Sequence, residues 1–336
     1  MIELLSGPSS GPHTMPISSQ FSGGEPKNCP TCGPAHLKTI GKIPASNIFA
    51  GRQLIEPLDG GRLYLCTKCH LAFRFPILPE QEMNALYIGG AEETWTSKPS
   101  NREDWRIARL WIRELLPQGS SILDVGCFDG AFLDTLDPTY QRFGVEIHQH
   151  ACNKAKSRGV NIIASRHEDL PEISEKFDAV VSFDLIEHVP DPVKLLRALS
   201  NAVRPCGMVI LSSGNFDAMT WRIMGSRYWY CAIAEHISFI SPRWCDLVIP
   251  EVGLAIERQR RFSHARTGIL GKFGDAAKNL MHYVAPCTTV WLREKGLGHR
   301  DVRHFPSLAE HPPSWMSARD HFIFLGRRTS PTPSPS

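Results

Sequence analysis

The chain has 336 residues, enough for one large domain and a smaller one. Its 42% hydrophobic and 21% charged residues are ordinary for a globular protein, and a formal net charge of +3 does not indicate a nucleic-acid partner. No apolar run approaches the roughly 20 residues that span a bilayer, and the first residues do not read as a secretory signal. We therefore expect a cytoplasmic protein with no membrane span.

Both ends of the chain are rich in small polar residues and proline and lack hydrophobic periodicity. We predict a disordered leader over residues 1–26 and a disordered tail over residues 328–336. The chain has ten cysteines and no export signal, so we expect reduced thiols or metal ligands rather than disulfides.

Two C-x-x-C pairs follow the leader, Cys29-Pro-Thr-Cys32 and Cys66-Thr-Lys-Cys69. Four thiolates in such pairs can close a tetrahedron around zinc, and they leave no open position, so the metal would be structural. The segment between the pairs is longer than the commonest spacing, but a ribbon tolerates a long hairpin there. We predict a zinc ribbon over residues 27–79; four unrelated thiols or a redox pair are the alternatives.

An amphipathic helix is predicted over residues 101–116, because apolar residues recur at Trp105, Ala108 and Ile112 and Pro117 ends the pattern. Short apolar strands then alternate with helices, which predicts a parallel sheet with right-handed crossovers. The predicted strands are residues 122–125, 142–147, 160–163, 177–183, 208–211, 254–257 and 321–325.

A glycine turn, Gly126-Cys-Phe-Asp-Gly130, follows the first strand. Both glycines tolerate positive φ, and a helix begins directly after the turn, where free N–H groups favour a carboxylate or phosphate. Asp124, at the end of the strand, cannot bury its charge without donors, so a cationic or N–H-bearing ligand is expected. Glu146, near the end of the second strand, is placed to hold two ribose hydroxyls.

These motifs continue with Glu168-Asp-Leu170 and with residues 177–189, and in this order they resemble the class I S-adenosylmethionine-dependent methyltransferases. The resemblance is greatest to the group of ubiquinone-biosynthesis O-methyltransferases, many of which carry an N-terminal ribbon. It covers about residues 100–262 and returns at the C-terminus. It implies an α/β fold, a seven-stranded Rossmann-like sheet whose last strand is antiparallel, with a methyltransferase domain over residues 80–327. Between the last two strands, apolar residues recur at helical spacing from Ile269 to Val284, which predicts a helical insertion at about 263–318.

The resemblance also implies the residues that bind the cofactor, with the amino-acid part at the glycine turn, the ribose at the second strand and the adenine edge further on. These residues are Asp124, Gly126, Cys127, Gly130, Glu146, Asp169, Leu170, Ser182 and Phe183. Phe128 stands where such families usually carry glycine. We expect its ring to pack under the cofactor; a fold that has lost the cofactor is the alternative. Tyr87 or Trp95 would fold over the cofactor, or belong to a plain linker.

The acceptor side is implied by the stretch Glu235-His236-Ile-Ser-Phe239, which lies near the acceptor in related enzymes. His236 is therefore the first candidate for a general base, and His188, beside Glu187, is the second; a structural histidine is the alternative for each. Asp184-Leu-Ile-Glu187-His188 with His236 resembles the E-x-x-E-H…H set that binds a divalent ion in small-RNA 2′-O-methyltransferases. A catalytic divalent ion is thus a further hypothesis.

Two compositional features bear on the acceptor. Residues 216–245 are dense in aromatic side chains, which suit a sugar ring, an aromatic acceptor or a base, with core packing as the alternative. Residues 251–303 hold ten Lys/Arg against five Asp/Glu, which favours an anionic acceptor unless this is a solvated basic face.

We predict an S-adenosylmethionine-dependent methyltransferase that acts on a small molecule or glycan precursor, with oxygen as the expected methylated atom. One alternative is an RNA methyltransferase whose ribbon docks nucleic acid, although residues 27–76 are only mildly basic, with seven Lys/Arg and two acids. The other is a non-catalytic scaffold. The sequence indicates no oligomeric state.

Overall fold

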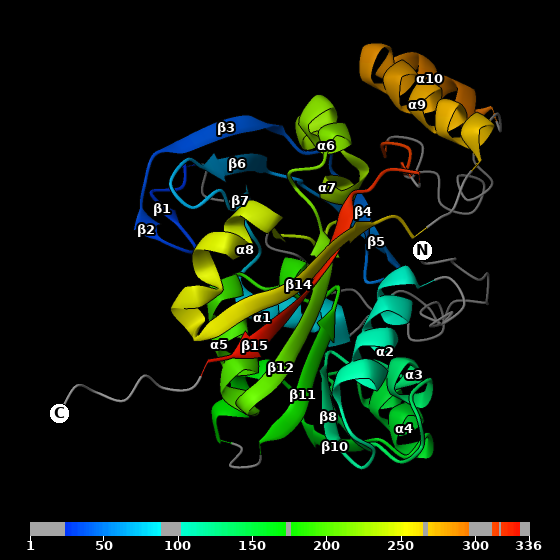
Figure 1. The fold of residues 1–336 in the computed structure, drawn as a ribbon. Helices are drawn as coiled ribbons and strands as arrows, with labels where there is room; N and C mark the ends of the chain where they lie inside the picture. Colours follow the sequence, from blue (N-terminus) through cyan, green and yellow to red (C-terminus); the bar gives the residue numbers. More distant parts are fainter. Residues whose placement is uncertain are drawn as a thin grey trace. The chain divides into compact units, whose positions relative to one another are not determined.

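The structure, a computed structural model, describes residues 24–88, 102–172, 176–264, 268–295, 311–315 and 317–329. Most of the predicted leader and tail, and Trp95, lie outside these residues. Two compact units divide the chain (Figure 1). The first unit comprises the described residues of Met1–Thr96, Phe216–Phe239 and Ala265–Ala318, and the second those of Ser97–Asn215, Ile240–His264 and Arg319–Ser336.

The second unit is built on a seven-stranded sheet in the order β10-β9-β8-β11-β12-β15-β14. The pairs from β10 to β12 are parallel, and β15 is antiparallel to both of its neighbours. The predicted fold class and the antiparallel last strand are therefore confirmed. The strands are β8 (Ser121–Val125), β9 (Gln141–Val145), β10 (Asn161–Ala164), β11 (Phe177–Phe183), β12 (Val203–Gly214), β14 (Leu254–Phe262) and β15 (His321–Arg328).

The central strands are buried on both faces, as their continuous apolar sequence requires. All of β8 is buried, and Val180 and Val181 of β11 are fully enclosed. In Figure 1, α2, α3 and α4 lie on one side of the sheet and α5 and α8 on the other. The helices of this unit are α2 (Glu103–Leu115), α3 (Ala131–Asp134), α4 (Gln149–Ser157), α5 (Pro192–Ala202) and α8 (Pro242–Val248), with 3₁₀ turns η2 (His167–Glu172), η3 (Ile186–His188) and η5 (Pro250–Val252).

Local sequence explains where these helices begin. Asp191 caps α5, since its carboxylate accepts the N–H of Lys194 at 2.9 Å and Pro192 occupies the first turn. On α2, Trp105, Ala108 and Ile112 face the core as the periodicity predicts. Because β8, β9 and β11 are parallel, their carboxyl ends meet at one edge of the sheet, where ligands bind in folds of this kind.

The first unit holds three small antiparallel sheets, ordered β13-β7-β6-β3, β1-β2 and β4-β5. Its strands are β1 (Asn28–Cys29), β2 (Gly33–Pro34), β3 (Leu37–Lys42), β4 (Ser46–Phe49), β5 (Arg52–Leu58), β6 (Arg62–Cys66), β7 (Ala72–Phe75) and β13 (Ser238–Phe239). Its helices are α1 (Glu80–Ile88), α6 (Met219–Met224), α7 (Trp229–Ala232), α9 (Ile269–Val284) and α10 (Pro286–Glu294), with the 3₁₀ turn η4 (Gly225–Arg227).

The aromatic residues of this unit form a core. Trp221, Tyr228, Tyr230 and Phe239 are almost fully buried, and the rings of Trp221 and Tyr228 stack with centroids 4.9 Å apart. Core packing therefore accounts for these residues, and a ligand platform is not needed to explain them. Tyr87, at the end of α1, packs edge-on against Phe49 at 5.0 Å, so it is a packed aromatic of this unit.

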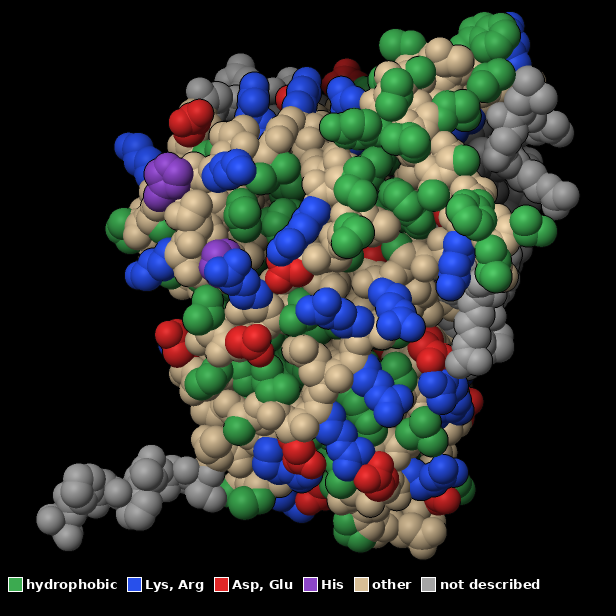
Figure 2. Space-filling view, turned by 45° about the horizontal axis from the view of Figure 1, so that its top comes forward, with side chains coloured by type: hydrophobic (Ala, Val, Ile, Leu, Met, Phe, Trp, Pro, Cys, Tyr) green, Lys and Arg blue, Asp and Glu red, His purple; other side chains and the backbone are tan. Residues whose placement is uncertain are grey.

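The helical insertion contains α9 and α10, which turn their apolar side chains to solvent. Their large apolar side chains are exposed, Leu270 at 88% and Phe273 at 71%. Hydrophobic side chains gather over this helix pair in Figure 2. None of the helices in the described ranges has the length and apolar character needed to cross a membrane.

Candidate functional site

The glycine turn after β8 adopts the left-handed conformations that its sequence predicts. Gly126 has φ +83° and Gly130 has φ +74°. The N–H groups of Gly126 and Cys127 donate to the carbonyl of Val145 at 2.9 and 3.1 Å, which ties the turn to the end of β9. The turn therefore lies at the edge where the strands end.

Gly130 is required for space as well as for its conformation. A Cβ there would lie 3.0 Å from a methyl of Val160 and 3.1 Å from Ala155. Gly159 has a similar φ of +77°, yet a Cβ would meet nothing within 4 Å.

Gly130→Ala should therefore lower the free energy of unfolding by about 1–3 kcal/mol more than Gly159→Ala. Denaturant unfolding of the two variants checks this, and equal losses would show that the contact at Gly130 is unimportant.

Phe128 keeps the backbone path that glycine would take. Its φ is +46°, which costs a non-glycine residue about 1–3 kcal/mol, and its N–H donates to Glu146 Oε2 at 2.9 Å. The departure from the usual glycine thus leaves the course of the turn intact. Packing of the Phe128 ring against a cofactor stays a prediction.

Asp124 is a buried carboxylate, 2% exposed, whose Oδ1 has no hydrogen-bond partner among the described residues. Burial, and then the nearby charge of Glu146, raise the pKa of Asp124 to about 8. A buried anion in this state is stabilised by a cation or by N–H donors. The site therefore favours a positively charged group, as the sequence predicts.

Glu146 is also buried, but two backbone donors hold its carboxylate in place. Oε1 accepts the N–H of His148 at 2.8 Å, and Oε2 accepts the N–H of Phe128 at 2.9 Å. Burial raises the pKa of Glu146. Each carboxylate oxygen has a second acceptor position, so this fixed carboxylate can also accept from two hydroxyl groups.

Two of the other predicted cofactor residues turn their side chains inward. The thiol of Cys127 packs on Gly144, where a Cβ would lie 2.5 Å from the sulfur, and burial raises the pKa of Cys127. The hydroxyl of Ser182 donates to the carbonyl of Val125 at 3.0 Å. Both side chains hold strands and turn together, and their contact with a cofactor stays a prediction.

The remaining predicted residues lie at the same edge of the second unit or in the turns that follow the strands. Phe183 packs on Phe132 with ring centroids 4.6 Å apart. Asp169 Oδ2 accepts the N–H of Arg166 at 3.1 Å, and Leu170 is buried beside it in η2.

An ion-pair network that the sequence analysis missed also lies in this unit. Arg102 donates to both oxygens of Asp104, at 3.0 and 2.6 Å, and its Nη2 lies 2.8 Å from Asp184 Oδ2. His264 Nδ1 lies 3.9 Å from Asp104 Oδ1, and burial lowers the pKa of His264 to about 4. Asp104, Asp184 and His264 are close enough to hold a metal ion, but the Arg102 guanidinium already pairs with both carboxylates.

One signal in the sequence marks this network. Asp104 lies four residues before Ala108, on the apolar face of α2, and it is fully buried. A carboxylate on the buried face of a helix needs a partner, and Arg102 and the Ser212 hydroxyl supply it. Asp184 Oδ1 and His264 Nδ1 are buried and make no hydrogen bond among the described residues.

The predicted catalytic residues fall in different units. In the second unit, Glu187 is fully buried and accepts the hydroxyl of Ser213 at 2.9 Å, and His188 follows it in η3. In the first unit, His236 is 6% exposed, and its Nδ1 lies 3.1 Å from the carbonyl of Tyr230. A carbonyl only accepts, so Nδ1 is the donor in this contact.

His236 is held firmly by its own segment. Arg74, itself buried, donates to the carbonyl of His236 at 3.0 Å and to the carbonyl of Cys231 at 2.6 Å. Glu235 accepts the N–H of Ala50. Side-chain contacts within the first unit thus fix the position of the Glu235-His236 pair.

The four cysteines of the two C-x-x-C pairs come together in the first unit. The sulfurs of Cys29 and Cys69 are 3.5 Å apart, as are those of Cys32 and Cys66, and all four lie within 4.8 Å of one another. A tetrahedral zinc ion bound at 2.3 Å requires sulfurs about 3.8 Å apart. The donor set and its spacing therefore fit zinc.

Electrostatics in this cysteine cluster also favour a cation. The hydrogen bond from Cys69 lowers the pKa of Cys29 to about 5, whereas burial raises the pKa of Cys32 to about 12. Without a cation, ionisation of one thiol opposes ionisation of the others. A divalent ion stabilises all four thiolates together.

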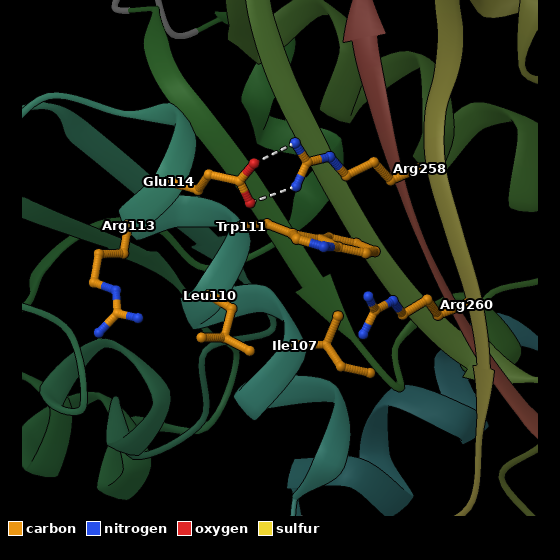
Figure 3. A pocket seen from close by; sticks show the side chains of 7 residues that line it. All are labelled: Ile107, Leu110, Trp111, Arg113, Glu114, Arg258 and Arg260. Atoms are coloured by element: carbon orange, nitrogen blue, oxygen red, sulfur yellow. Dashed lines mark hydrogen bonds and ion pairs between the residues drawn. The ribbon is translucent and has the colours of Figure 1, made fainter.

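A shallow cavity of about 430 Å³ lies between α2 and β14 (Figure 3). Glu114 accepts two hydrogen bonds from the Arg258 guanidinium, at 2.7 and 2.8 Å, across its mouth. None of the predicted cofactor or catalytic residues lines the cavity. Arg258, one of the cations in the basic stretch, is therefore already paired.

The strand order, the antiparallel last strand and the glycine turn flanked by Asp124 and Glu146 define the second unit as a class I methyltransferase fold. Comparison with sequence families agrees, since residues 101–259 match the family described as a methyltransferase domain. Over these residues, a little under half of the chain, the fold and the sequence match together support a class I S-adenosylmethionine-dependent methyltransferase domain, as the motifs implied.

Individual relatives are similar at low identity. The ubiquinone biosynthesis O-methyltransferase of Leptothrix cholodnii is 24% identical over 198 residues, which cover 53% of this chain and 82% of that protein. The enzyme of the same name from Neisseria meningitidis serogroup C is 33% identical over 108 residues, 29% of this chain and 45% of that protein. The chain therefore spans less than half the length of the second relative.

Among solved structures, the N-methyltransferase NodS of Bradyrhizobium japonicum, in complex with S-adenosylhomocysteine, is similar with a TM-score of 0.41 and 14% identity. The similarity covers 68% of this chain and 86% of that chain.

Proposed function

We propose that the protein binds S-adenosylmethionine at the carboxyl edge of the second unit's sheet. The observation that carries this proposal is the buried carboxylate of Asp124, whose Oδ1 lacks a hydrogen-bond partner among the described residues and which lies beside a glycine turn. Asp124 would hold the ammonium group, and Glu146 the two ribose hydroxyls. Asp169 and Leu170 would hold the adenine edge, with Phe183 and the backbone around Gly126, Cys127, Gly130 and Ser182 completing the site.

The bound cofactor supplies an activated methyl group, and the chain supplies orientation. Methyl transfer is an in-line displacement, so most of the acceleration comes from holding the acceptor atom in line with the methyl group. A proton acceptor is needed when the acceptor is a hydroxyl with a pKa well above 7. We assign this role first to His236, whose ring is held by its Nδ1 contact with the Tyr230 carbonyl, and second to His188 beside Glu187.

The acceptor is a small molecule or a glycan precursor, and the methylated atom is oxygen. The names of the two relatives, both O-methyltransferases, support oxygen. An RNA acceptor is less well supported, because Arg74, one of the seven cations of the ribbon segment, is buried and donates only to backbone carbonyls in the bonds described above. We also propose an anionic group on the acceptor. Not every cation of the basic stretch is available to bind it, because Arg258 is paired with Glu114 and Arg293 is buried.

We further propose that Cys29, Cys32, Cys66 and Cys69 hold a structural zinc ion, and that the protein is cytoplasmic. The fit of the four sulfurs to a tetrahedron supports the first of these.

Transfer of a labelled methyl group tests the proposed reaction. Zinc-loaded protein with methyl-labelled S-adenosylmethionine is expected to label a small-molecule extract, and His236→Ala should slow labelling by about 100-fold or more while S-adenosylhomocysteine still binds. Total RNA serves as the competing acceptor. Label that enters RNA alone would favour an RNA methyltransferase. If the protein binds the cofactor but labels neither the extract nor the RNA, a non-catalytic scaffold would be favoured.

A further inference from the structure

The helix pair α9–α10 has its polar side buried and its apolar side exposed. The buried residues of α9 are Asp275, Asn279 and His282, and those of α10 are Thr289 and Arg293. The large apolar side chains have exposed fractions from 42% to 88%: Ile269, Leu270, Phe273, Leu280, Met281, Tyr283, Val284 and Trp291. A surface helix normally turns its apolar stripe to the core, so this pair has the opposite orientation.

Specific polar contacts keep this orientation. Asp275 accepts the N–H of Ser317 at 2.8 Å and pairs with Lys278 at 2.6 Å. Asn279 donates to the carbonyl of Asp275 at 2.9 Å, and Arg293 donates to the carbonyl of His311. Turning the apolar stripe inward would break the bonds of Asp275 to Ser317 and of Arg293 to His311, which reach outside the helix pair. Each buried polar group left without a partner costs about 1–3 kcal/mol.

The charges around the apolar side are mostly positive. Lys272 and Lys295 are exposed, and Lys278 is 42% exposed. Arg227 donates to the carbonyl of Tyr283 at 3.3 Å, which adds a fourth cation beside α9. Of the two acids in residues 268–295, Asp275 is buried and only Glu294 is exposed.

This combination matches helices that lie in the plane of a membrane interface. Such helices combine an apolar face, aromatic residues at the level of the headgroups, and Lys or Arg that attract anionic lipids. Phe273, Tyr283 and Trp291 supply the aromatic rings. We propose that the apolar side of α9–α10 docks on an anionic lipid surface without crossing it. This binding is independent of the proposed methyl transfer.

Vesicle co-sedimentation of the full-length, zinc-loaded protein tests the proposal. The protein is expected to bind phosphatidylcholine vesicles that contain phosphatidylglycerol, and to bind pure phosphatidylcholine at least about tenfold more weakly. Leu270→Ser with Phe273→Ser should lower binding to the anionic vesicles at least about tenfold, because two large apolar side chains no longer enter the interface. Lys272→Gln should lower it by about fivefold.

Ile55→Ser is the matched control, because Ile55 is a single apolar side chain on β5, also in the first unit, and is 69% exposed. It should leave vesicle binding unchanged, and every variant should still bind S-adenosylhomocysteine as the wild type does. No binding to anionic vesicles, or an equal loss in Ile55→Ser, would overturn the proposal. So would a dimer in light scattering that Leu270→Ser with Phe273→Ser dissociates, since the face would then join two copies of the chain.

Discussion

Asp124→Asn is expected to weaken binding of S-adenosylhomocysteine by about 10- to 100-fold at pH 8, measured by calorimetry. The variant keeps the size of the side chain and removes its charge. A hydrogen bond between a buried carboxylate and an ammonium group is worth about 1.5–3 kcal/mol, which corresponds to this loss. Unchanged affinity in Asp124→Asn would show that the ammonium group lies elsewhere.

The pH dependence of this binding follows from the same residue. The pKa of Asp124 is about 8 in the free protein, so below pH 8 most molecules carry the protonated acid. Binding of an ammonium group then requires loss of that proton, and the apparent Kd should rise by up to about tenfold for each pH unit between pH 8 and pH 6. The slope should disappear in Asp124→Asn.

Glu146→Gln serves as a second control for this pH dependence. The charge of Glu146 contributes to the raised pKa of Asp124, so its removal should shift the inflection to lower pH. A wild-type Kd that is constant from pH 6 to pH 8 would contradict the assignment of Asp124.

Cys66→Ser is expected to remove the bound zinc and to lower the melting temperature by about 10 °C or more. Cys66 is fully buried and lies 3.5 Å from Cys32. Structural zinc contributes its binding energy to folding, so loss of one ligand destabilises the whole ribbon. Atomic absorption and thermal unfolding measure the two effects. Cys206→Ser is the matched control, because Cys206 is an exposed cysteine outside the cluster. A similar loss of zinc or stability in that variant would argue against zinc binding by the four clustered cysteines.

Much of the second unit could be predicted from the sequence, because its strands are buried on both faces and are continuous in their apolar residues. The glycine turn was predictable for a similar reason, since positive φ at Gly126 and Gly130 leaves few other residues. Ends of elements were less predictable. β14 runs to Phe262, past its apolar start, because pairing with β15 continues through Arg258, Arg260 and Arg261.

The sequence did not show which side chains point to the core and which point to solvent. The aromatic residues near Trp221 fit a ligand platform and a core equally well, and only their packing against each other identifies the core. Likewise, the periodicity predicts that residues 269–284 form a helix, but it does not say which face turns to solvent. The bonds of Asp275 to Ser317 and of Arg293 to His311 determine which face is buried.

The residues carried over from the family pattern show a similar limit. Position in the motif places Cys127 in the turn and Ser182 near the end of β11, yet the thiol packs on Gly144 and the hydroxyl donates to the Val125 carbonyl. Asp104 and Arg102 lie outside any motif considered in the sequence, although they form a two-pronged, partly buried ion pair. Such contacts arise from tertiary packing, and one sequence gives little sign of them.

Crystallisation of the zinc-loaded protein with S-adenosylhomocysteine is the most direct measurement of where the cofactor binds. The expected result is a ligand at the carboxyl edge of the seven-stranded sheet, its ammonium group on Asp124 and its ribose hydroxyls on Glu146. A ligand bound elsewhere, or none at saturating concentration, would contradict the account.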